Sequence, residues 1–212
     1  MSEPSALLWD RPAGKPHATL LFAHGAGAPM DSDFMTAMST ALVVHGIAVA
    51  RFEFPYMARR RAGGGKRPPD RQPVLLAAFH DALRAMPDSA RCFIGGKSMG
   101  GRMASLLAAE GANVPGVVCF GYPFHPPGKL ATTRTAHLPG LPVPMLVCQG
   151  VRDPFGTQEQ VAGYLLGQNV SLHWVPDGDH DLKPRKASGL THRENIAAAA
   201  AAASAFMVRA SR

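Results

Sequence analysis

Hydrophobic and polar residues alternate along the chain in segments of two kinds. Short runs that are almost wholly apolar, rich in β-branched or aromatic residues, predict buried strands. Longer segments with apolar residues three or four positions apart predict helices between them. Strands are predicted in the first half of 18–27 and in 47–55, 91–96, 116–124, 144–150 and 170–176. Helices are predicted in 31–46, 74–86, 98–111 and 157–167, and in a last segment that starts at residue 191.

This alternation indicates the α/β fold class. Strands that are apolar on both sides are typical of a mostly parallel sheet covered by helices on both faces. In such sheets, ligands bind beyond the carboxyl ends of the strands. The residues that directly follow each predicted strand are therefore the first places to look for chemistry.

The last predicted helix begins with a recognisable signal. Thr191 and Glu194 have the spacing of a capping box, in which each side chain bonds to the other residue's backbone N–H. The helix continues through the alanine run Ala197–Ala203. Alanine is the best helix former, so the run predicts a close-packed helix rather than a low-complexity tail.

Four predicted strands are followed by polar or glycine-rich motifs. His24-Gly25-Ala26-Gly27 follows the first, and Gly96-Lys97-Ser98-Met99-Gly100 follows the third. Asp153 and His180 come after the two last strands. A serine, an acid and a histidine in this chain order are typical of α/β-hydrolases.

The segment Gly96–Gly100 has the G-x-S-x-G pattern of a nucleophile elbow. There the serine occupies a strained turn between strand and helix, and side chains two positions before and after it would collide with neighbouring backbone. The turn exposes the Ser98 Oγ and leaves the Met99 N–H to hold an oxyanion. Ala26 is expected to supply the second N–H. The alternative is a tight-turn serine that only caps the helix.

The acid and the base are chosen by their distance from the strand ends. Asp153 directly follows a strand, whereas Asp177, Asp179 and Asp181 are too close in sequence to His180 to reach it from across the sheet. The alternative for Asp153 is an Asx-Pro turn that caps the following helix. His180 is preferred over the other histidine of this region, which lies inside a predicted strand.

Three further residues are candidates for the substrate pocket. His24 lies in the predicted oxyanion loop, where we expect it chiefly to support that loop. Tyr122 and His125 follow another strand end, in "GYPFHPP". His125 either lines the pocket or is an ordinary loop histidine.

Length and composition favour one globular domain over residues 1–212. Apolar residues make up 46% of the 212 positions, enough for a sizeable core. The three cysteines lie in apolar runs and are expected to be buried and free, and no spacing resembles a zinc site. The N-terminus does not resemble a signal peptide and no apolar run is long enough to span a bilayer, so we expect a cytoplasmic protein without a membrane partner. The oligomeric state stays open.

The net charge of +7 raises the question of an anionic partner. Six of the 22 basic residues lie in Ala58–Arg71, which also has three glycines and two prolines and is therefore predicted to be a loop. It has no interleaved aromatic residues and no helix-turn-helix or sheet platform accompanies it, so we expect no specific nucleic-acid site. A small-molecule substrate is the expected partner.

The whole chain resembles small α/β-hydrolases of the dienelactone-hydrolase-like type. More narrowly, it resembles bacterial relatives of the testis-expressed and non-specific-lethal-complex hydrolase-like proteins. The motifs that carry this likeness are "HGAG", "GGKSMGGR", "GYPFHPPGK" and "DGDHDL". The resemblance implies the α/β-hydrolase fold with Ser98 as nucleophile, Asp153 as acid and His180 as base. True dienelactone hydrolases have a cysteine nucleophile, whereas this chain has Ser98.

These observations together predict a serine hydrolase with no large cap domain. It would act on small esters, thioesters or amides through an acyl-enzyme on Ser98, with no metal and no organic cofactor. The alternative is a catalytically weak or inactive protein that keeps the fold for interactions.

Overall fold

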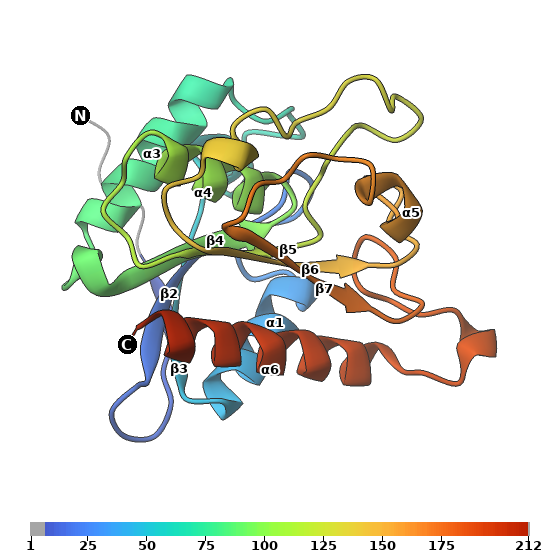
Figure 1. Cartoon of the computed structure of the whole chain (residues 1–212). Helices are drawn as coiled ribbons and strands as arrows, with labels where there is room; N and C mark the ends of the chain where they lie inside the picture. Colours follow the sequence, from blue (N-terminus) through green and yellow to red (C-terminus); the bar gives the residue numbers. More distant parts are fainter. Residues whose placement is uncertain (1–6, 212) are drawn as a thin grey trace.

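The computed structural model describes residues 7–211, which form a seven-stranded sheet with helices on both faces (Figure 1). The strands lie in the order β1-β3-β2-β4-β5-β6-β7. Only β1 is antiparallel to its neighbour, and all other neighbouring strands are parallel. The predicted fold class is confirmed. The strands are β1 (Leu8–Asp10), β2 (Ala18–Ala23), β3 (Ile47–Phe52), β4 (Cys92–Lys97), β5 (Val117–Phe120), β6 (Met145–Gly150) and β7 (Val170–Val175).

Six α-helices connect or flank these strands. They are α1 (Asp33–Val44), α2 (Pro55–Arg61), α3 (Gln72–Arg84), α4 (Met99–Ala109), α5 (Gln158–Val161) and α6 (His192–Ala210). Helices α3 and α4 cover one face of the sheet, and α1 and α6 cover the other (Figure 1). The crossovers therefore bring the carboxyl ends of the parallel strands to one edge of the sheet, as expected for this topology.

The side chains of β2 illustrate why both faces are buried. Successive residues of a strand point to opposite sides of a sheet. Leu21 and Ala23 pack in the cluster that includes Phe79 of α3. Leu20 and Phe22 pack in the cluster that includes Met38 of α1. All of these side chains are buried, so an apolar run without alternation is what this sheet requires.

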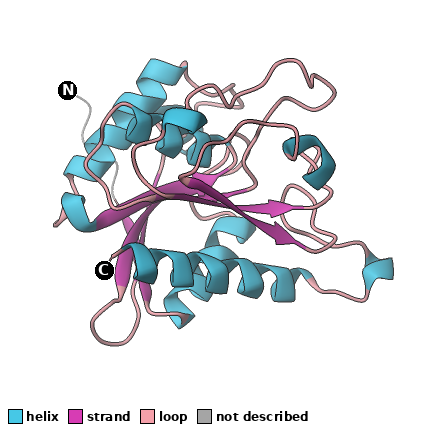
Figure 2. Cartoon of the chain, viewed as in Figure 1, coloured by secondary structure: helices cyan, strands magenta, loops and turns pink. Residues whose placement is uncertain are grey.

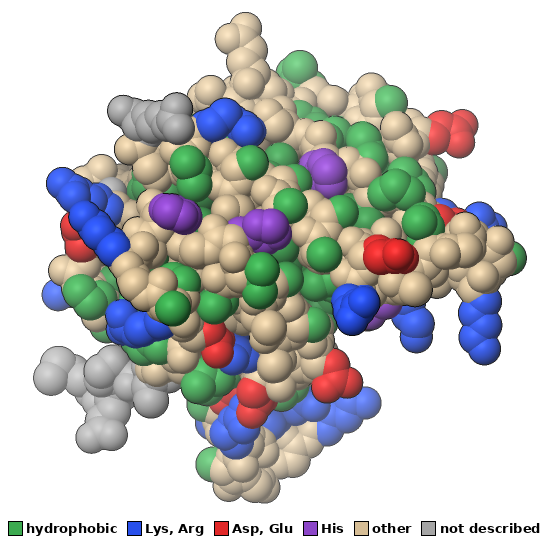
Figure 3. Space-filling model, turned by 90° about the horizontal axis from the view of Figure 1, so that it is seen from below, with side chains coloured by type: hydrophobic (Ala, Val, Ile, Leu, Met, Phe, Trp, Pro, Cys, Tyr) green, Lys and Arg blue, Asp and Glu red, His purple; other side chains and the backbone are tan. Residues whose placement is uncertain are grey.

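Helix α6 packs as its alanine run predicts. Ala199, Ala200 and Ala203 are fully buried against the sheet, and the capping box between Thr191 and Glu194 is formed. Figure 3 views the molecule from the side of α1 and α6 and shows hydrophobic atoms in small groups among polar and charged side chains. The small alanine side chains thus allow a long helix to lie close to the sheet.

The prediction of a loop over Ala58–Arg71 is wrong in its first part. Helix α2 begins at Pro55 and extends to Arg61, so three of the six basic residues are helical. Proline is favoured at the first position of a helix because its φ is already helical and its missing N–H is not needed there. Tyr56 and Met57 are buried, which anchors the helix on the core. Residues 62–71 contain neither helix nor strand.

Two further elements differ from the prediction. The helix expected over 157–167 is a single turn, α5, although a capping box does form at Thr157. Beyond it the chain turns at Gly163, and Tyr164 and Leu166 pack against the core as irregular structure. Strand β1 was not predicted, because three residues are too few for a hydrophobic period. It is held by pairing with β3.

The connection between β5 and β6 contains no α-helix. Apart from the short 3₁₀ turn Leu138–Gly140 it is loop (Figure 2). Its apolar side chains Tyr122, Phe124 and Leu138 are fully buried in the core below it. In the described part of the chain this segment therefore forms no large cap, in agreement with the predicted fold.

Residues 1–6 and 212 lie outside the described residues. The expectation that the N-terminus is not a signal peptide involves these residues and stays a prediction. The same holds for the expected limits of the single domain, residues 1–212. Within 7–211, no helix is both long enough and apolar enough to cross a membrane.

Candidate active site

Three loops at the carboxyl edge of the sheet bring Ser98, Asp153 and His180 together. Ser98 lies between β4 and α4, Asp153 follows β6, and His180 follows β7. The His180 Nε2 lies 2.9 Å from the Ser98 Oγ, and its Nδ1 lies 2.8 Å from the Asp153 Oδ2. The three side chains thus form the hydrogen-bonded chain that the sequence predicts, while their catalytic roles stay predictions.

The partners of the imidazole fix its tautomer. The Asp153 carboxylate can only accept, so the His180 Nδ1 carries the proton. The Nε2 lone pair then faces the Ser98 hydroxyl and can take its proton. Asp153 is fully buried, and the Phe155 ring lies 4.3 Å from the imidazole centroid at an angle of 33°. The base is therefore held in one orientation.

The backbone of Ser98 has the strain of a nucleophile elbow. Its φ is 51° and its ψ is −114°, a conformation that residues with a side chain rarely adopt. A Cβ on Gly96 would collide with the backbone of Gly100 and Gly101. A Cβ on Gly100 would lie 2.5 Å from the Ala23 carbonyl oxygen at the end of β2. Both glycines are therefore required by close backbone approach, as the sequence predicts.

We expect Gly100→Ala to lower the free energy of unfolding by about 2–3 kcal/mol, or the Tm by roughly 5–10 °C. The added methyl group meets backbone rather than a side chain that can move away. Gly140→Ala is the matched control, because a Cβ there has no neighbour within 4 Å. Thermal unfolding of the two variants checks the prediction, and equal Tm values would contradict it.

The two backbone N–H groups predicted to hold an oxyanion belong to Met99 and Ala26. Met99 is the first residue of α4, and Ala26 lies in the loop after β2. Within residues 7–211, neither N–H donates to a protein acceptor. Gly25 lies beside the elbow, since a Cβ there would be 3.8 Å from the Ser98 Cβ. Both N–H groups are thus free of protein acceptors, and their role as oxyanion donors stays a prediction.

His24 and Tyr56 hold the loop that carries Ala26. The His24 Nε2 accepts from the Phe54 N–H at 3.1 Å, and its Nδ1 donates to the Gly25 oxygen at 2.7 Å. Burial lowers the pKa of His24, so the neutral ring that these bonds need is favoured. The Tyr56 hydroxyl donates to the Ala26 oxygen at 2.9 Å. The expected supporting role of His24 fits these contacts.

His24, Tyr122 and His125, the candidates for the substrate pocket, are all buried in this structure. All three are at most 1% exposed. Tyr122 donates its hydroxyl to the Arg134 oxygen, and the His125 Nδ1 bonds to the Pro126 oxygen. Each side chain turns inward because it supplies a hydrogen bond to a loop that has few backbone partners of its own. They support the loops around the site, and their place in the substrate pocket stays a prediction.

Sequence reasoning missed Gln149, which lies under the acid. Its side chain is fully buried and donates to the Asp153 Oδ2 at 2.9 Å. Its Oε1 accepts from the Tyr122 N–H at 2.7 Å. Gln149 thus connects the acid loop to the end of β5. Its only sequence signal is a polar residue at the end of the apolar run 144–150.

Lys97 was also missed, although it precedes the serine. Its Nζ donates to the His180 backbone oxygen at 2.7 Å and pairs with Asp181 at 3.2 Å. The side chain is buried, and burial lowers its pKa. The contact joins two residues 83 positions apart, so the elbow and the loop that carries the base are held at a fixed separation.

The carboxylates close to His180 in sequence stabilise its loop. The Asp179 Oδ1 accepts from the N–H groups of Asp181 and Lys183, both at 2.9 Å. Asp177 pairs with Arg152 and Arg185. Neither carboxylate is the one that contacts the His180 ring. The choice of Asp153 over these rivals therefore agrees with the hydrogen bonds.

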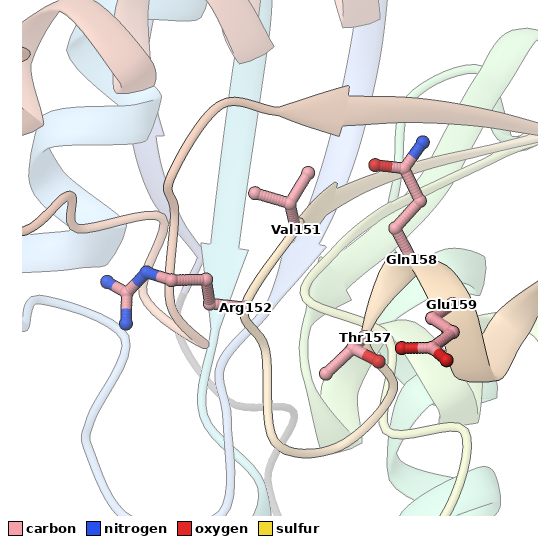
Figure 4. A pocket seen from close by; sticks show the side chains of 5 residues that line it. All are labelled: Val151, Arg152, Thr157, Gln158 and Glu159. Carbon is pink, nitrogen blue, oxygen red and sulfur yellow. The ribbon is translucent and has the colours of Figure 1, made fainter. Parts of the chain in front are cut away.

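A shallow hollow lies behind the acid loop. It is lined by Val151, Arg152 and the Thr157–Glu159 segment (Figure 4). Arg152 extends away from the other side chains of this group (Figure 4). None of the hydrogen-bonded residues Ser98, Asp153 and His180 lines it. This hollow is therefore separate from the candidate active site.

Comparison with known proteins places the geometry in context. Residues 16–208 match the model of a family described as alpha/beta hydrolase domain. This match includes every strand from β2 to β7 and all three residues of the hydrogen-bonded chain.

Solved structures with the same fold cover almost the whole chain. An esterase domain from Rhodothermus marinus is 18% identical, with a TM-score of 0.69, over 97% of this chain and 92% of the other. A dienelactone hydrolase from Anabaena variabilis is 21% identical, with a TM-score of 0.69, over 95% of this chain and 89% of the other. A serine hydrolase from Xanthomonas campestris, described as lacking a lid, is 22% identical, with a TM-score of 0.65. The match covers 99% of this chain and 95% of the other. At these identities the likeness establishes the fold.

Proposed function

The chain belongs to the alpha/beta hydrolase domain family, and from this premise we propose that it is a serine hydrolase that cleaves small carboxylic esters. The observation that carries the proposal is the hydrogen-bonded chain from the Ser98 hydroxyl through His180 to the buried Asp153. An accessible hydroxyl on a strained turn, with an imidazole lone pair aimed at it, is the arrangement that acyl transfer requires.

The proposed reaction uses the groups already described. The His180 Nε2 takes the Ser98 proton as Oγ attacks the ester carbon, and the Met99 and Ala26 N–H groups hold the developing oxyanion. The protonated His180 then gives its proton to the leaving alcohol, which departs and leaves an acyl group on Ser98. Water, activated by His180, releases the acid and restores the hydroxyl. Asp153 keeps the imidazole in the productive tautomer throughout.

Three more specific expectations from the sequence analysis belong to this proposal. They are the narrower relationship to the testis-expressed and non-specific-lethal-complex hydrolase-like proteins, the cytoplasmic location, and the action on a small molecule without metal or cofactor. The three cysteines are buried and free, which supports a reducing compartment. Thioesters and amides are chemically related substrates, since the same acyl-enzyme would form.

We expect kcat/KM on p-nitrophenyl esters to be highest for acyl groups of about C2 to C6 and not to rise for longer chains. A site without a cap buries little of a long chain, so each further CH₂ gains much less than the roughly 0.8 kcal/mol of full burial. Tyr122, Phe124, Leu138 and Leu141 of the β5–β6 connection are already packed in the core, which leaves Leu130 as its exposed large apolar side chain. Steady-state kinetics over an ester series from C2 to C12, below and above the critical micelle concentrations, measures both effects.

Two outcomes of this series would count against the proposal in different ways. Activity that climbs steadily to C12, or that jumps above the critical micelle concentration, would mean that an apolar lid forms over the site. No turnover of any ester would favour the alternative of an inactive hydrolase-fold protein that acts through interactions.

A further inference from the structure

A basic cleft adjoins the loop that carries the Ala26 N–H. Its volume is about 530 Å³, and it is lined by Ala26 and Gly27 on one side and by Arg60 and Lys66–Pro69 on the other. The cations come from the end of α2 and from the following loop. One wall of the cleft is thus the proposed oxyanion loop itself, so a group bound in the cleft would lie next to the reacting ester.

The lining of the cleft has three cations and no carboxylate. Arg60, Lys66 and Arg67 are in no ion pair within residues 7–211. Other basic residues of the same segment are already neutralised: Arg59 pairs with Asp70, and Arg61 pairs with Glu53 and Asp31. Of the four basic residues of Ala58–Arg71 that form no ion pair within residues 7–211, three therefore line the cleft, and the fourth is Arg71.

Arg67 is a lining residue of the cleft that a hydrogen bond holds in place. Its Nη2 donates to the Gly64 oxygen at 2.7 Å, but its Nε is buried and has no hydrogen-bond partner. As a lining residue of the cleft, Arg67 can donate from its other guanidinium N–H groups to an anionic oxygen, and such hydrogen bonds are strengthened by charge.

We propose that this cleft binds a carboxylate or phosphate group carried by the ester substrate, so that the enzyme prefers anionic esters to neutral ones. The inference rests on the proposed serine-hydrolase function and adds the substrate class to it. Arg60, Lys66 and Arg67 supply the attraction, and the hydrogen bond from the Arg67 Nη2 to the Gly64 oxygen holds the Arg67 side chain in place. The proline pair Pro68–Pro69 keeps the wall of the cleft stiff, because proline fixes φ.

The test compares pairs of esters of similar size, in which one member carries a negative charge and the other is neutral. On the acyl side, mono-p-nitrophenyl adipate is paired with p-nitrophenyl hexanoate. On the leaving-group side, 4-acetoxybenzoate is paired with its methyl ester. We expect kcat/KM for the anionic member of at least one pair to exceed that of the neutral member about tenfold, which corresponds to about 1.4 kcal/mol. The preference should shrink as sodium chloride rises from about 50 to 500 mM.

Variants of the cleft locate the effect. In Arg60→Gln, Lys66→Gln and the double variant, the ratio of the two kcat/KM values should fall toward one, furthest in the double variant. Arg71→Gln is the matched control, because it removes one charge from the same segment but does not line the cleft. It should keep both the ratio and the activity on neutral esters.

The outcomes separate the inference from the function on which it rests. Equal kcat/KM within both pairs, or a preference that survives in the double variant, overturns the anionic substrate class and leaves the serine hydrolase intact. No hydrolysis of any of the four esters overturns the proposed function and the inference with it.

Discussion

Replacing Ser98 with alanine is expected to lower kcat on p-nitrophenyl acetate on the order of 10⁶-fold, because the nucleophile of the proposed reaction is removed. The Ser98 Oγ is the hydroxyl that lies 2.9 Å from the His180 Nε2. Without it no acyl-enzyme can form, and only the oxyanion donors and substrate binding remain to accelerate attack by water. The backbone of the elbow needs no change, since alanine keeps the Cβ that serine already has at this φ.

Covalent labelling checks the same variant independently of turnover. A fluorophosphonate probe should add one adduct to the wild-type protein, visible in its intact mass, and none to Ser98→Ala. Ser105→Ala is the control, because Ser105 is a buried serine of α4, the helix that follows Ser98, and its hydroxyl donates to the Arg102 oxygen. Labelling of Ser98→Ala at the wild-type level would show that the nucleophile is another residue.

Replacing Asp153 with asparagine is expected to leave a folded protein whose kcat is lowered about 10⁴-fold. The Asp153 Oδ2 faces two donors, the His180 Nδ1 and the Gln149 Nε2, and its Oδ1 accepts from the Phe155 N–H. An asparagine amide has one oxygen, so in either orientation its NH₂ group meets a donor. The imidazole can relieve this by moving its proton to Nε2, and it then cannot take the proton of Ser98.

Asp179→Asn is the matched control for the acid. The Asp179 Oδ1 accepts two backbone N–H groups, and an asparagine oxygen can accept both of them. Its kcat should therefore stay within a few fold of the wild type, with far-UV circular dichroism confirming that both variants are folded. If Asp179→Asn loses activity and Asp153→Asn keeps it, the proposed acid is wrong.

The local patterns of the sequence were sufficient for the six parallel strands, for four of the helices and for the main residues of the candidate site, but not for β1 or α2. Apolar runs and helical spacing each reflect a period that a short segment carries by itself. Ser98, Asp153 and His180 could be chosen because each directly follows a strand, and parallel strands bring their carboxyl ends to one edge. The glycines of the elbow were predictable for the same local reason, since the turn itself excludes a side chain at Gly96 and Gly100.

Only the tertiary structure decided which polar side chains support that site and where the basic residues go. Lys97 bonds to a backbone oxygen 83 residues away, and Gln149 of β6 bonds to Tyr122, which follows the neighbouring strand β5. Such contacts leave no periodic pattern in the sequence. His24, Tyr122 and His125 are typical pocket residues in isolation, but each turns inward to satisfy a loop. In the same way, glycines and prolines indicated a loop where the burial of Tyr56 and Met57 stabilises a helix. Local propensities differ by about 1 kcal/mol per residue or less for most residue types, so burial of a few large side chains overrides them.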